Sequence, residues 1–290
     1  MKFHRVYIEI TNICGLKCSF CTTPATENAS MSLKVFENTI KQLPSYTKEV
    51  ALHILGDPLV LSNLTSYLDI LANYNLRAFI TTSGYYIKNH TVKTLLHPSV
   101  KQINISINSY NKNDNIITFD EYLEPIFELI DSKLANNIEA FINLRIWNLD
   151  ETMSETNFNK GFFSKVAKHF NITLDSKRIY QEKPKSIRIA YKTLLHFDSY
   201  FEWPSLDNPI YGDGTCQGLS SHFGILSNGK VVPCCLDSKG DMELGNITKE
   251  PLEKILYNSK STSIINGFKA NKALEELCQR CSYKNRFNKE

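Results

Sequence analysis

Three cysteines near the start of the chain are the residues whose spacing points most directly to chemistry. Cys14, Cys18 and Cys21 follow an alternating apolar run from Val6 to Ile10 that is typical of a strand. Structural zinc sites close with four protein ligands, and iron–sulfur clusters that only carry electrons are usually held by four cysteines. Three thiolates at this spacing therefore predict a metal cluster with one corner open to an outside ligand. A disulfide or a zinc knuckle is the alternative.

The pattern Cys-x3-Cys-x2-Cys, with Phe20 just before its third cysteine, resembles the signature of radical S-adenosylmethionine (radical SAM) enzymes. The resemblance implies that the thiolates hold a [4Fe-4S] cluster whose fourth iron is chelated by S-adenosyl-L-methionine. It also implies that Phe20 packs near the adenine. One electron from such a cluster gives a 5′-deoxyadenosyl radical, which takes hydrogen from a substrate. Because the cofactor supplies the reactivity, no acid–base pair is required and no catalytic side chain is predicted.

A short segment further along resembles the family's Gly-Gly-Glu-Pro loop, whose backbone binds the methionyl ammonium group. Here it reads Leu55, Gly56, Asp57 and Pro58, so leucine and aspartate replace the first glycine and the glutamate. Glycine lets a main chain approach a ligand closely, and proline fixes the turn. Because the contact is made by the main chain, we expect this loop to bind the cofactor. An ordinary turn is the alternative.

Three other polar residues resemble cofactor-binding positions of the family. Ser83 follows the third predicted strand, where the family often has Thr-Asn-Gly. Ser106 and Arg145, on the fourth and fifth strands, resemble positions that bind the methionyl carboxylate, for which an arginine fork is well suited. The alternatives are a solvent-facing arginine and serine hydroxyls bonded to nearby backbone.

A second group of cysteines lies near the carboxyl end of the chain. Cys216, Gly229 and Cys234 resemble the opening of the SPASM and twitch domains, which are auxiliary iron–sulfur modules of radical SAM enzymes. A full SPASM domain has further cysteines after the last pair, so we expect one auxiliary [4Fe-4S] cluster and two clusters in total. Cys235 reads as a buried thiol, and a four-cysteine zinc ribbon is the alternative for the group. The four expected ligands are Cys216, Cys234, Cys278 and Cys281.

Strand-like segments that alternate with helical ones predict an α/β fold with a parallel sheet. Ligands of such sheets bind at the carboxyl ends of the strands, and the cysteine triad follows the first strand. Six strands are too few for a closed eight-stranded barrel, and the resemblance implies a partial (β/α)6 TIM-like barrel. We expect the barrel in residues 1–200 and a small C-terminal auxiliary-cluster domain in 201–290, with 191–215 as a connector. The strands are expected at 6–10, 49–55, 77–82, 102–107, 139–146 and 186–190.

Composition narrows the classes of protein. With 42% hydrophobic residues among 290, the chain can bury a core. No apolar run approaches the roughly 18 residues of a membrane span, so no membrane partner is expected. Eight cysteines in two groups are more typical of metal ligands in a reducing compartment than of disulfides, which predicts a cytoplasmic protein.

The net charge of +3 is too small to require a nucleic-acid partner. Basic residues do gather near the carboxyl end, and they read as a solvated tail, with a phosphate-binding patch as the alternative. They are Arg280, Lys284, Arg286 and Lys289.

Together these features favour a radical SAM enzyme that oxidises or cross-links a small molecule or a peptide. The auxiliary cluster is expected to transfer electrons, and an electron-donating reductase such as flavodoxin or ferredoxin is the expected partner. A radical enzyme that modifies RNA and a zinc-binding structural protein are the alternatives. The identity of the substrate does not follow from the sequence.

Overall fold

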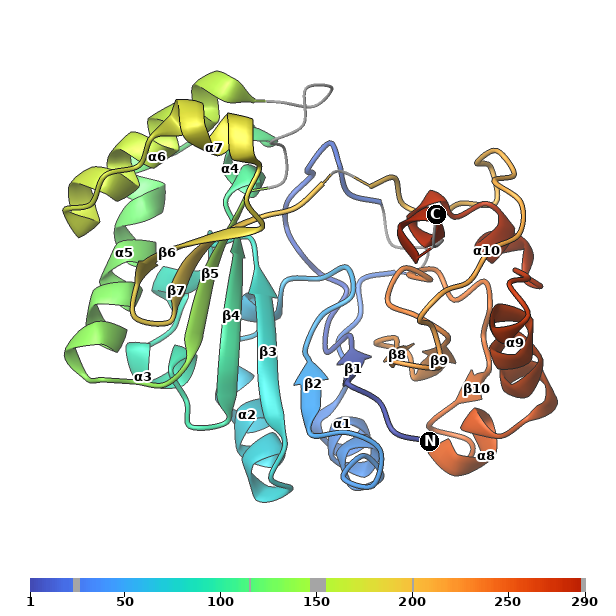
Figure 1. Ribbon diagram of the computed structural model, residues 1–290. Coiled ribbons are helices and arrows are strands. Elements are labelled where there is room, and N and C mark those ends of the chain that lie inside the picture. The colour runs from blue at the N-terminus through green and yellow to red at the C-terminus, as the bar shows by residue number, and fades with distance from the viewer. Residues whose placement is uncertain (23–26, 115, 147–154, 200, 288–290) are drawn as a thin grey trace. The chain divides into compact units, whose positions relative to one another are not determined.

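The computed structural model describes residues 1–22, 27–114, 116–146, 155–199 and 201–287 (Figure 1). The chain divides into two compact units. The first unit comprises Met1–Gly15, Phe20–Phe79 and Phe201–Glu290, and the second comprises Leu16–Ser19 and Ile80–Tyr200. The carboxyl-terminal region therefore belongs to the same compact unit as the first strands.

In the first unit, strand β1 lies between two parallel neighbours, β2 and β8. Strand β3 continues the parallel sheet beside β2, whereas β8, β9 and β10 form an antiparallel extension, giving the order β10-β9-β8-β1-β2-β3. A segment more than 200 residues away along the chain thus pairs with the strand that precedes the cysteine triad. The strands are β1 Arg5–Ile8, β2 Glu49–Ala51, β3 Arg77–Thr82, β8 His222–Ile225, β9 Lys230–Val232 and β10 Gly245–Asn246.

The second unit has the strand order β4-β5-β7-β6, in which β4, β5 and β7 are parallel and β6 is antiparallel to β7. The expectation that residues 186–190 form the sixth parallel strand is wrong, because residues 193–197 pair with β5 instead. The turn between β6 and β7 is too short for a parallel crossover, and Lys133 holds it by donating to the Tyr191 carbonyl. The strands are β4 Val100–Ser106, β5 Phe141–Ile146, β6 Ser186–Ala190 and β7 Thr193–Phe197.

The second unit's sheet has one apolar and one polar face. Ile142, Leu144 and Leu195 alternate along β5 and β7 and are fully buried. Helices α5 and α6 cover this face: Lys133 of α5 reaches Thr193 at 3.4 Å, and the ring of Phe163 in α6 packs edge-on against that of Phe197. The residues that alternate with Ile142, Leu144 and Leu195 along β5 and β7 therefore point to the opposite face of the sheet.

The helices fall between the strands, as the sequence predicts, and the expected α/β class with an unclosed parallel sheet is confirmed. Among the described residues, β10 and β6 each pair with one strand only. None of the helices formed by the described residues has the length and apolar character that a membrane crossing requires. The helices are α1 Leu33–Ile40, α2 Leu64–Asn73, α3 Val92–Leu95, α4 Asn108–Asn111, α5 Phe119–Ala135, α6 Thr156–Phe170, α7 Ser176–Glu182, α8 Leu252–Leu256, α9 Ser259–Lys269 and α10 Glu276–Gln279, with 3-10 turns at Pro58–Val60, Ile87–Asn89 and Ser282–Phe287.

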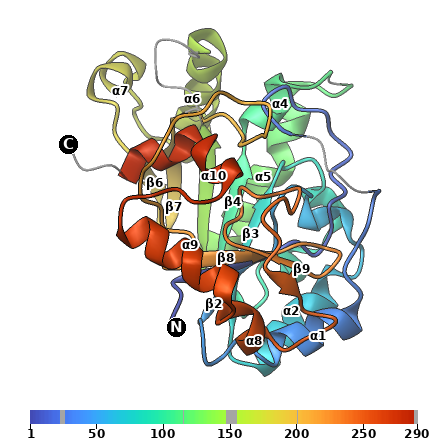
Figure 2. The ribbon, with the colours of Figure 1, turned by 90° about the vertical axis from the view of Figure 1, so that its right-hand side faces the viewer.

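Strands β8 and β9 form an antiparallel hairpin whose turn contains Asn228 and Gly229. Gly229 has φ of +85°, and its N–H donates to the Leu226 carbonyl at 2.8 Å. Asn228 is not among the described residues with positive φ, so the tight turn with two left-handed residues that Asn-Gly suggests does not form. Helices α8, α9 and α10 lie beside this hairpin (Figure 2).

A buried carboxylate links the loop after β2 to the β8–β9 hairpin. Glu9, directly after β1, is 3% exposed. One of its oxygens accepts the Leu55 N–H at 3.1 Å and the other accepts the Ser227 N–H at 3.1 Å. Burial raises the pKa of Glu9, and the two backbone N–H donors partly offset that rise. One side chain therefore satisfies backbone donors from two distant segments.

Replacing Glu9 by glutamine is expected to destabilise the protein by about 1–3 kcal/mol, because one backbone N–H would then face an amide NH2 instead of an oxygen. Urea unfolding of the reduced, iron-free protein measures the change. Glu128→Gln, at an exposed position of α5, is the matched control and should leave the midpoint unchanged. Equal midpoints for both variants would show that Glu9 does not link these segments.

Candidate functional site

The predicted cofactor loop lies directly against the backbone that follows β1. A Cβ added to Gly56 would lie 2.0 Å from the Thr11 carbonyl oxygen, so no side chain fits there. The Asp57 N–H donates to the Ile13 carbonyl at 3.0 Å. The Asp57 carboxylate accepts the Leu59 N–H at 3.0 Å and caps the turn that follows. The loop and the segment leading to the first cysteine are thus packed together. The buried loop residues include Gly56, Asp57 and Pro58.

The triad cysteines are accessible to different degrees. Cys14 and Cys18 are half-buried and Cys21 is exposed, while Phe20 is half-buried. Within the second unit, the Asn113 side-chain N–H donates to Cys18 Sγ at 2.9 Å. Hydrogen bonds to ligand sulfurs tune iron–sulfur clusters, so Asn113 is a functional candidate.

Asn113 also fixes the backbone of the cysteine loop. Its side-chain oxygen accepts the Lys17 N–H at 2.8 Å, and its amide donates to the Ser109 carbonyl at 2.8 Å. The asparagine follows α4, 95 residues after Cys18. Sequence reasoning missed it, because nothing in the local pattern distinguishes it from a loop residue.

A row of polar residues crosses the polar face of the second unit's sheet. Ser106, Arg145 and His196 are register partners on β4, β5 and β7, so they share that face. Arg145 Nη2 lies 3.3 Å from an Asp198 carboxylate oxygen. Burial first, and then the Arg145 charge, lower the pKa of His196, and its Nδ1 is a buried atom with no hydrogen-bond partner among the described residues. The structure thus places two sequence-predicted residues, Ser106 and Arg145, in one row and adds a neutral imidazole.

Amide side chains form a second row on the same face. Asn104 Oδ1 accepts from Gln102 at 2.8 Å and from Asn143 at 3.1 Å, and Asn104 Nδ2 donates to Thr81 at 3.3 Å. The Asn143 Oδ1 is buried without a partner among the described residues. Buried polar atoms normally find a partner, so this face is suited to a ligand that carries hydrogen-bonding groups.

Ser83 lies in the loop after β3 and is buried. Its carbonyl accepts the Tyr122 hydroxyl at 2.6 Å. Gly84 has φ of +92°, and a Cβ there would lie 2.7 Å from the Tyr122 hydroxyl. Tyr122 of α5 therefore holds the loop in place, and it was not identified from the sequence.

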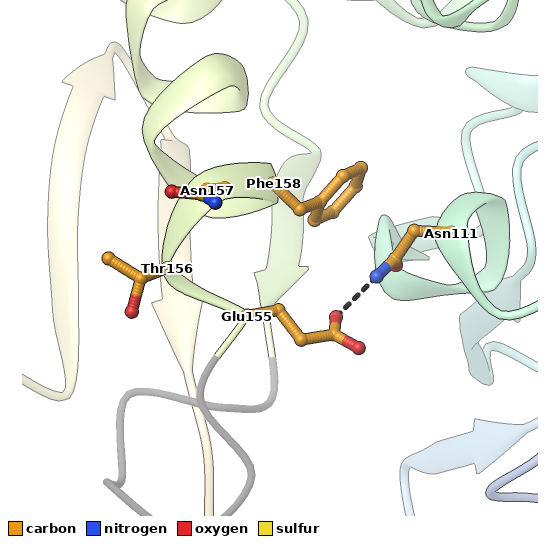
Figure 3. Close-up of a pocket in the computed structure, with 5 residues that line it drawn as sticks. All are labelled: Asn111, Glu155, Thr156, Asn157 and Phe158. Atoms are coloured by element: carbon orange, nitrogen blue, oxygen red, sulfur yellow. Dashed lines mark hydrogen bonds between the residues drawn. The ribbon is translucent and has the colours of Figure 1, made fainter.

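An open cavity of about 390 Å³ lies where the chain leaves β4 and enters α6. Glu155 Oε2 accepts from the Asn108 side chain at 3.0 Å and also from Asn111, and Glu155 pairs with Lys112. Asn111 and Glu155 point toward each other, while Thr156 points away (Figure 3). The walls of the cavity are mainly polar and include one aromatic ring. The lining residues are Asn111, Glu155, Thr156, Asn157 and Phe158.

All five C-terminal cysteines of the first unit are linked by electrostatic interactions with at least one other member of the group. Burial is the main cause of the raised pKa of Cys234 and of Cys278. Cys235 and then Cys216 raise the pKa of Cys234 further, and Cys216 also raises the pKa of Cys278. Cys278 also raises the pKa of Cys234, and Cys281 raises the pKa of Cys278. The structure thus places the four predicted ligands, Cys216, Cys234, Cys278 and Cys281, in one region of the first unit, together with Cys235.

Cys235 lies in a different environment from Cys234. It packs against the apolar cluster of Ile54, Leu226 and Val232, and its thiol hydrogen-bonds with Tyr7. Burial is the main cause that raises the pKa of Cys235 to about 12, with a smaller contribution from Cys216.

The surroundings of the C-terminal thiols suit iron–sulfur ligation. Backbone N–H groups of Gln217 and Gly218 bond to Cys216, and those of Tyr283 and Lys284 bond to Cys281. Such donors stabilise a thiolate. No three His, Cys, Asp or Glu side chains in the described part of the chain converge as the ligands of one metal ion would.

A loop brings a thioether against one of these thiols. The Asp237 carboxylate accepts N–H groups from Asp241 at 2.8 Å and from Met242 at 2.9 Å. Burial raises the pKa of Asp237 to about 6. Met242 Sδ lies 3.4 Å from Cys278 Sγ, so the loop shields this side of the thiol group.

Two family models match the chain. The radical SAM superfamily matches residues 8–155, and the SPASM iron–sulfur cluster-binding domain matches residues 216–282. The chain belongs to the radical SAM superfamily. It is therefore an enzyme of the radical SAM class with a C-terminal SPASM domain, and its family binds S-adenosylmethionine and iron–sulfur clusters.

Similar proteins cover nearly the whole of this radical SAM enzyme. GTP 3′,8-cyclase of Aquifex aeolicus (strain VF5) is 24% identical over 285 residues, covering 87% of this chain and 88% of the relative. BtrN in complex with AdoMet and 2-DOIA superposes with a TM-score of 0.60 at 17% identity, covering 97% of this chain and 94% of BtrN. SuiB of Streptococcus suis bound to precursor peptide SuiA gives a TM-score of 0.59 at 16% identity, covering 100% of this chain and 74% of SuiB. The two structural likenesses establish the fold.

Gly56→Ala is expected to destabilise this radical SAM enzyme by about 2 kcal/mol or more, because the new methyl group would overlap the Thr11 carbonyl and force the backbone apart. Gly161→Ala is the control: Gly161 lies inside α6 with nothing near its missing Cβ, so alanine should stabilise by about 0.5–1 kcal/mol. Urea unfolding of both variants measures the difference. A neutral Gly56→Ala change would contradict the close approach of the two segments.

Proposed function

We propose that this radical SAM enzyme oxidises or cross-links a small-molecule substrate with the help of two [4Fe-4S] clusters, one near each end of the chain. The four half-buried cysteines Cys216, Cys234, Cys278 and Cys281, which lie in one region of the first unit, carry the proposal of a second cluster. We assign the barrel to residues 1–200 and the auxiliary-cluster domain to 201–290.

In this proposal Cys14, Cys18 and Cys21 hold the cluster that binds S-adenosylmethionine. When bound, the cluster and the cofactor supply a 5′-deoxyadenosyl radical that takes hydrogen from the substrate. Phe20 packs beside the adenine and, with the barrel wall, keeps water from the site. Asn113 orients Cys18 through its hydrogen bond.

The loop after β2 offers backbone groups to the methionyl ammonium. Gly56 and Asp57 are held against the segment after β1, which fixes the position of those groups relative to Cys14. Pro58 contributes no N–H donor, so the loop presents carbonyl acceptors to a cation. A bulkier residue at Gly56 would separate the two segments.

Ser83, Ser106 and Arg145 are proposed to bind the remaining polar groups of the cofactor. Arg145 is a guanidinium with a carboxylate partner, Asp198, at 3.3 Å. Binding a second carboxylate would require Arg145 to share its five donors, which its fork geometry allows. The Asn143 oxygen and the His196 nitrogen on the same face, which find no partner among the residues that the structure describes, are left for the substrate.

A small molecule is favoured because two of the similar proteins, BtrN and the GTP 3′,8-cyclase, were solved with or are named for small molecules. The chain matches 94% of BtrN, solved with 2-DOIA, and 88% of a GTP 3′,8-cyclase. It matches 74% of SuiB, which was solved with a precursor peptide. A peptide is the second candidate because the SuiB likeness spans all of this chain.

The auxiliary cluster is proposed to transfer electrons. Four cysteine ligands leave no iron free for the substrate, so this cluster would accept the electron released when a substrate radical becomes an oxidised product. An electron-donating reductase such as flavodoxin or ferredoxin is the proposed partner for the N-terminal cluster.

Anaerobic incubation of the reconstituted enzyme with dithionite and S-adenosylmethionine is expected to yield 5′-deoxyadenosine, measured by chromatography. A Cys18→Ser variant should give none, because the N-terminal cluster would lose a ligand. A Cys235→Ser variant is the control and should retain the activity. Absence of 5′-deoxyadenosine from the iron-replete protein would overturn the proposed function.

Cys234→Ser is expected to lose roughly half of the protein's iron, since four thiolates hold a [4Fe-4S] cluster and one would be missing. Cys235→Ser should keep its iron, because Cys235 faces Tyr7 and the apolar cluster. Iron and sulfide analysis after anaerobic reconstitution measures both. The reverse pattern would exchange the roles of the two cysteines.

A further inference from the structure

The C-terminal basic residues do not form the solvated tail that the sequence predicts. Lys284, on the 3-10 turn Ser282–Phe287, is 1% exposed. Arg280 is half-buried and donates to the Asn208 carbonyl at 2.5 Å, and Arg286 stacks over the Tyr283 ring at 4.5 Å. Lys289 lies outside the described residues. Packing thus draws a flexible cation, Lys284, into the interior of the first unit.

Burying an ammonium group is costly unless other groups compensate for the lost water. Lys284 Nζ donates to the Cys281 carbonyl at 3.1 Å and to the Gln279 carbonyl at 3.3 Å. It also lies 5.7 Å from the centre of the Tyr211 ring. These neutral partners replace part of its hydration but supply no opposite charge.

The groups that favour the charged form of Lys284 are mainly cysteines, which carry a negative charge as thiolates. Burial lowers the pKa of Lys284, and the opposing contributions come first from Cys281, then Cys278 and Cys216, with Asp213 last. These three thiols are proposed ligands of the auxiliary cluster. Their other charged neighbours include carboxylates, since Asp237 and Glu275 both act on Cys278. Lys284 is therefore a cation set among groups that are neutral or negative.

We propose that the Lys284 ammonium is a fixed positive charge that raises the reduction potential of the auxiliary iron–sulfur cluster. Reduction adds one electron to the cluster, and a nearby cation stabilises the more negative product. Net charge, hydrogen bonds and exclusion of solvent set the potentials of such clusters. A higher potential makes the cluster a better acceptor for the electron that a substrate radical gives up. The inference rests on the proposed ligand set.

The test uses the full-length chain with Cys14, Cys18 and Cys21 changed to alanine, so that the auxiliary cluster is its only iron centre. The midpoint potential is measured by a redox titration followed by electron paramagnetic resonance, with iron and sulfide analysis alongside. Lys284→Met keeps the length and apolar stem of the side chain without its charge, and Lys284→Arg keeps the charge. Lys272→Met, at an exposed position of the same region, is the control.

Lys284→Met is expected to shift the midpoint potential to more negative values. Lys284→Arg should shift it less than Lys284→Met, and Lys272→Met should not shift it. Equal potentials in the parent and Lys284→Met would overturn the inference and leave the proposed function intact. A parent protein that binds no iron would instead overturn the auxiliary cluster itself.

A second measurement decides the case in which Lys284→Met does not retain iron. A charge directed at the cluster should matter more when the cluster is bound, so Lys284→Gln should lower the thermal midpoint of the iron-loaded protein more than that of the iron-free protein. If Lys284→Gln loses its iron as well, its iron-free form should unfold at the parent's midpoint. An equal loss of stability with and without iron, or, in a variant that binds no iron, a lower midpoint of the iron-free form, would show that Lys284 acts only as a structural tie.

Discussion

The buried Glu9 carboxylate and the close packing beside it determine how the first unit is assembled. Its two oxygens accept N–H groups from Leu55 and Ser227, which belong to the loop after β2 and to the β8–β9 hairpin. Because these backbone donors lie away from water, leaving either unpaired would cost free energy. Gly56 approaches the backbone after β1 beside this link. The proposed cofactor loop and the SPASM hairpin are therefore held by the same side chain.

This arrangement explains why a C-terminal module shares a sheet with the first strand. Strand β8 pairs with β1 in parallel over four residues, so the SPASM hairpin is built onto the barrel strand that leads to the triad. Sheet pairing fixes register through both backbone bonds and side-chain burial. The main-chain pairing of β8 with β1 therefore fixes the position of the auxiliary module, in addition to surface contacts.

The two units differ in how their polar and ionisable side chains are stabilised. In the first, the C-terminal cysteines are half-buried, and partial removal from water by itself favours the neutral thiol; backbone N–H donors at Cys216 and Cys281 favour the thiolate form. In the second, polar side chains gather on one face of the sheet while helices cover the other. On this face, the Asn143 oxygen and the His196 Nδ1 have no hydrogen-bond partner within the part of the chain that the structure describes. Both units thus concentrate polar groups where a bound group would satisfy them.

The sequence by itself determined the α/β class, the radical SAM family and the grouping of its cysteines, because these features depend on residue types at short spacing. It did not determine which of two adjacent strands joins the parallel sheet: β7, with three buried residues, pairs with β5, and the short turn makes the more exposed β6 antiparallel to it. It also missed Asn113 and the burial of Lys284. These depend on contacts between distant segments and on the exclusion of water, which exist only after the chain has folded.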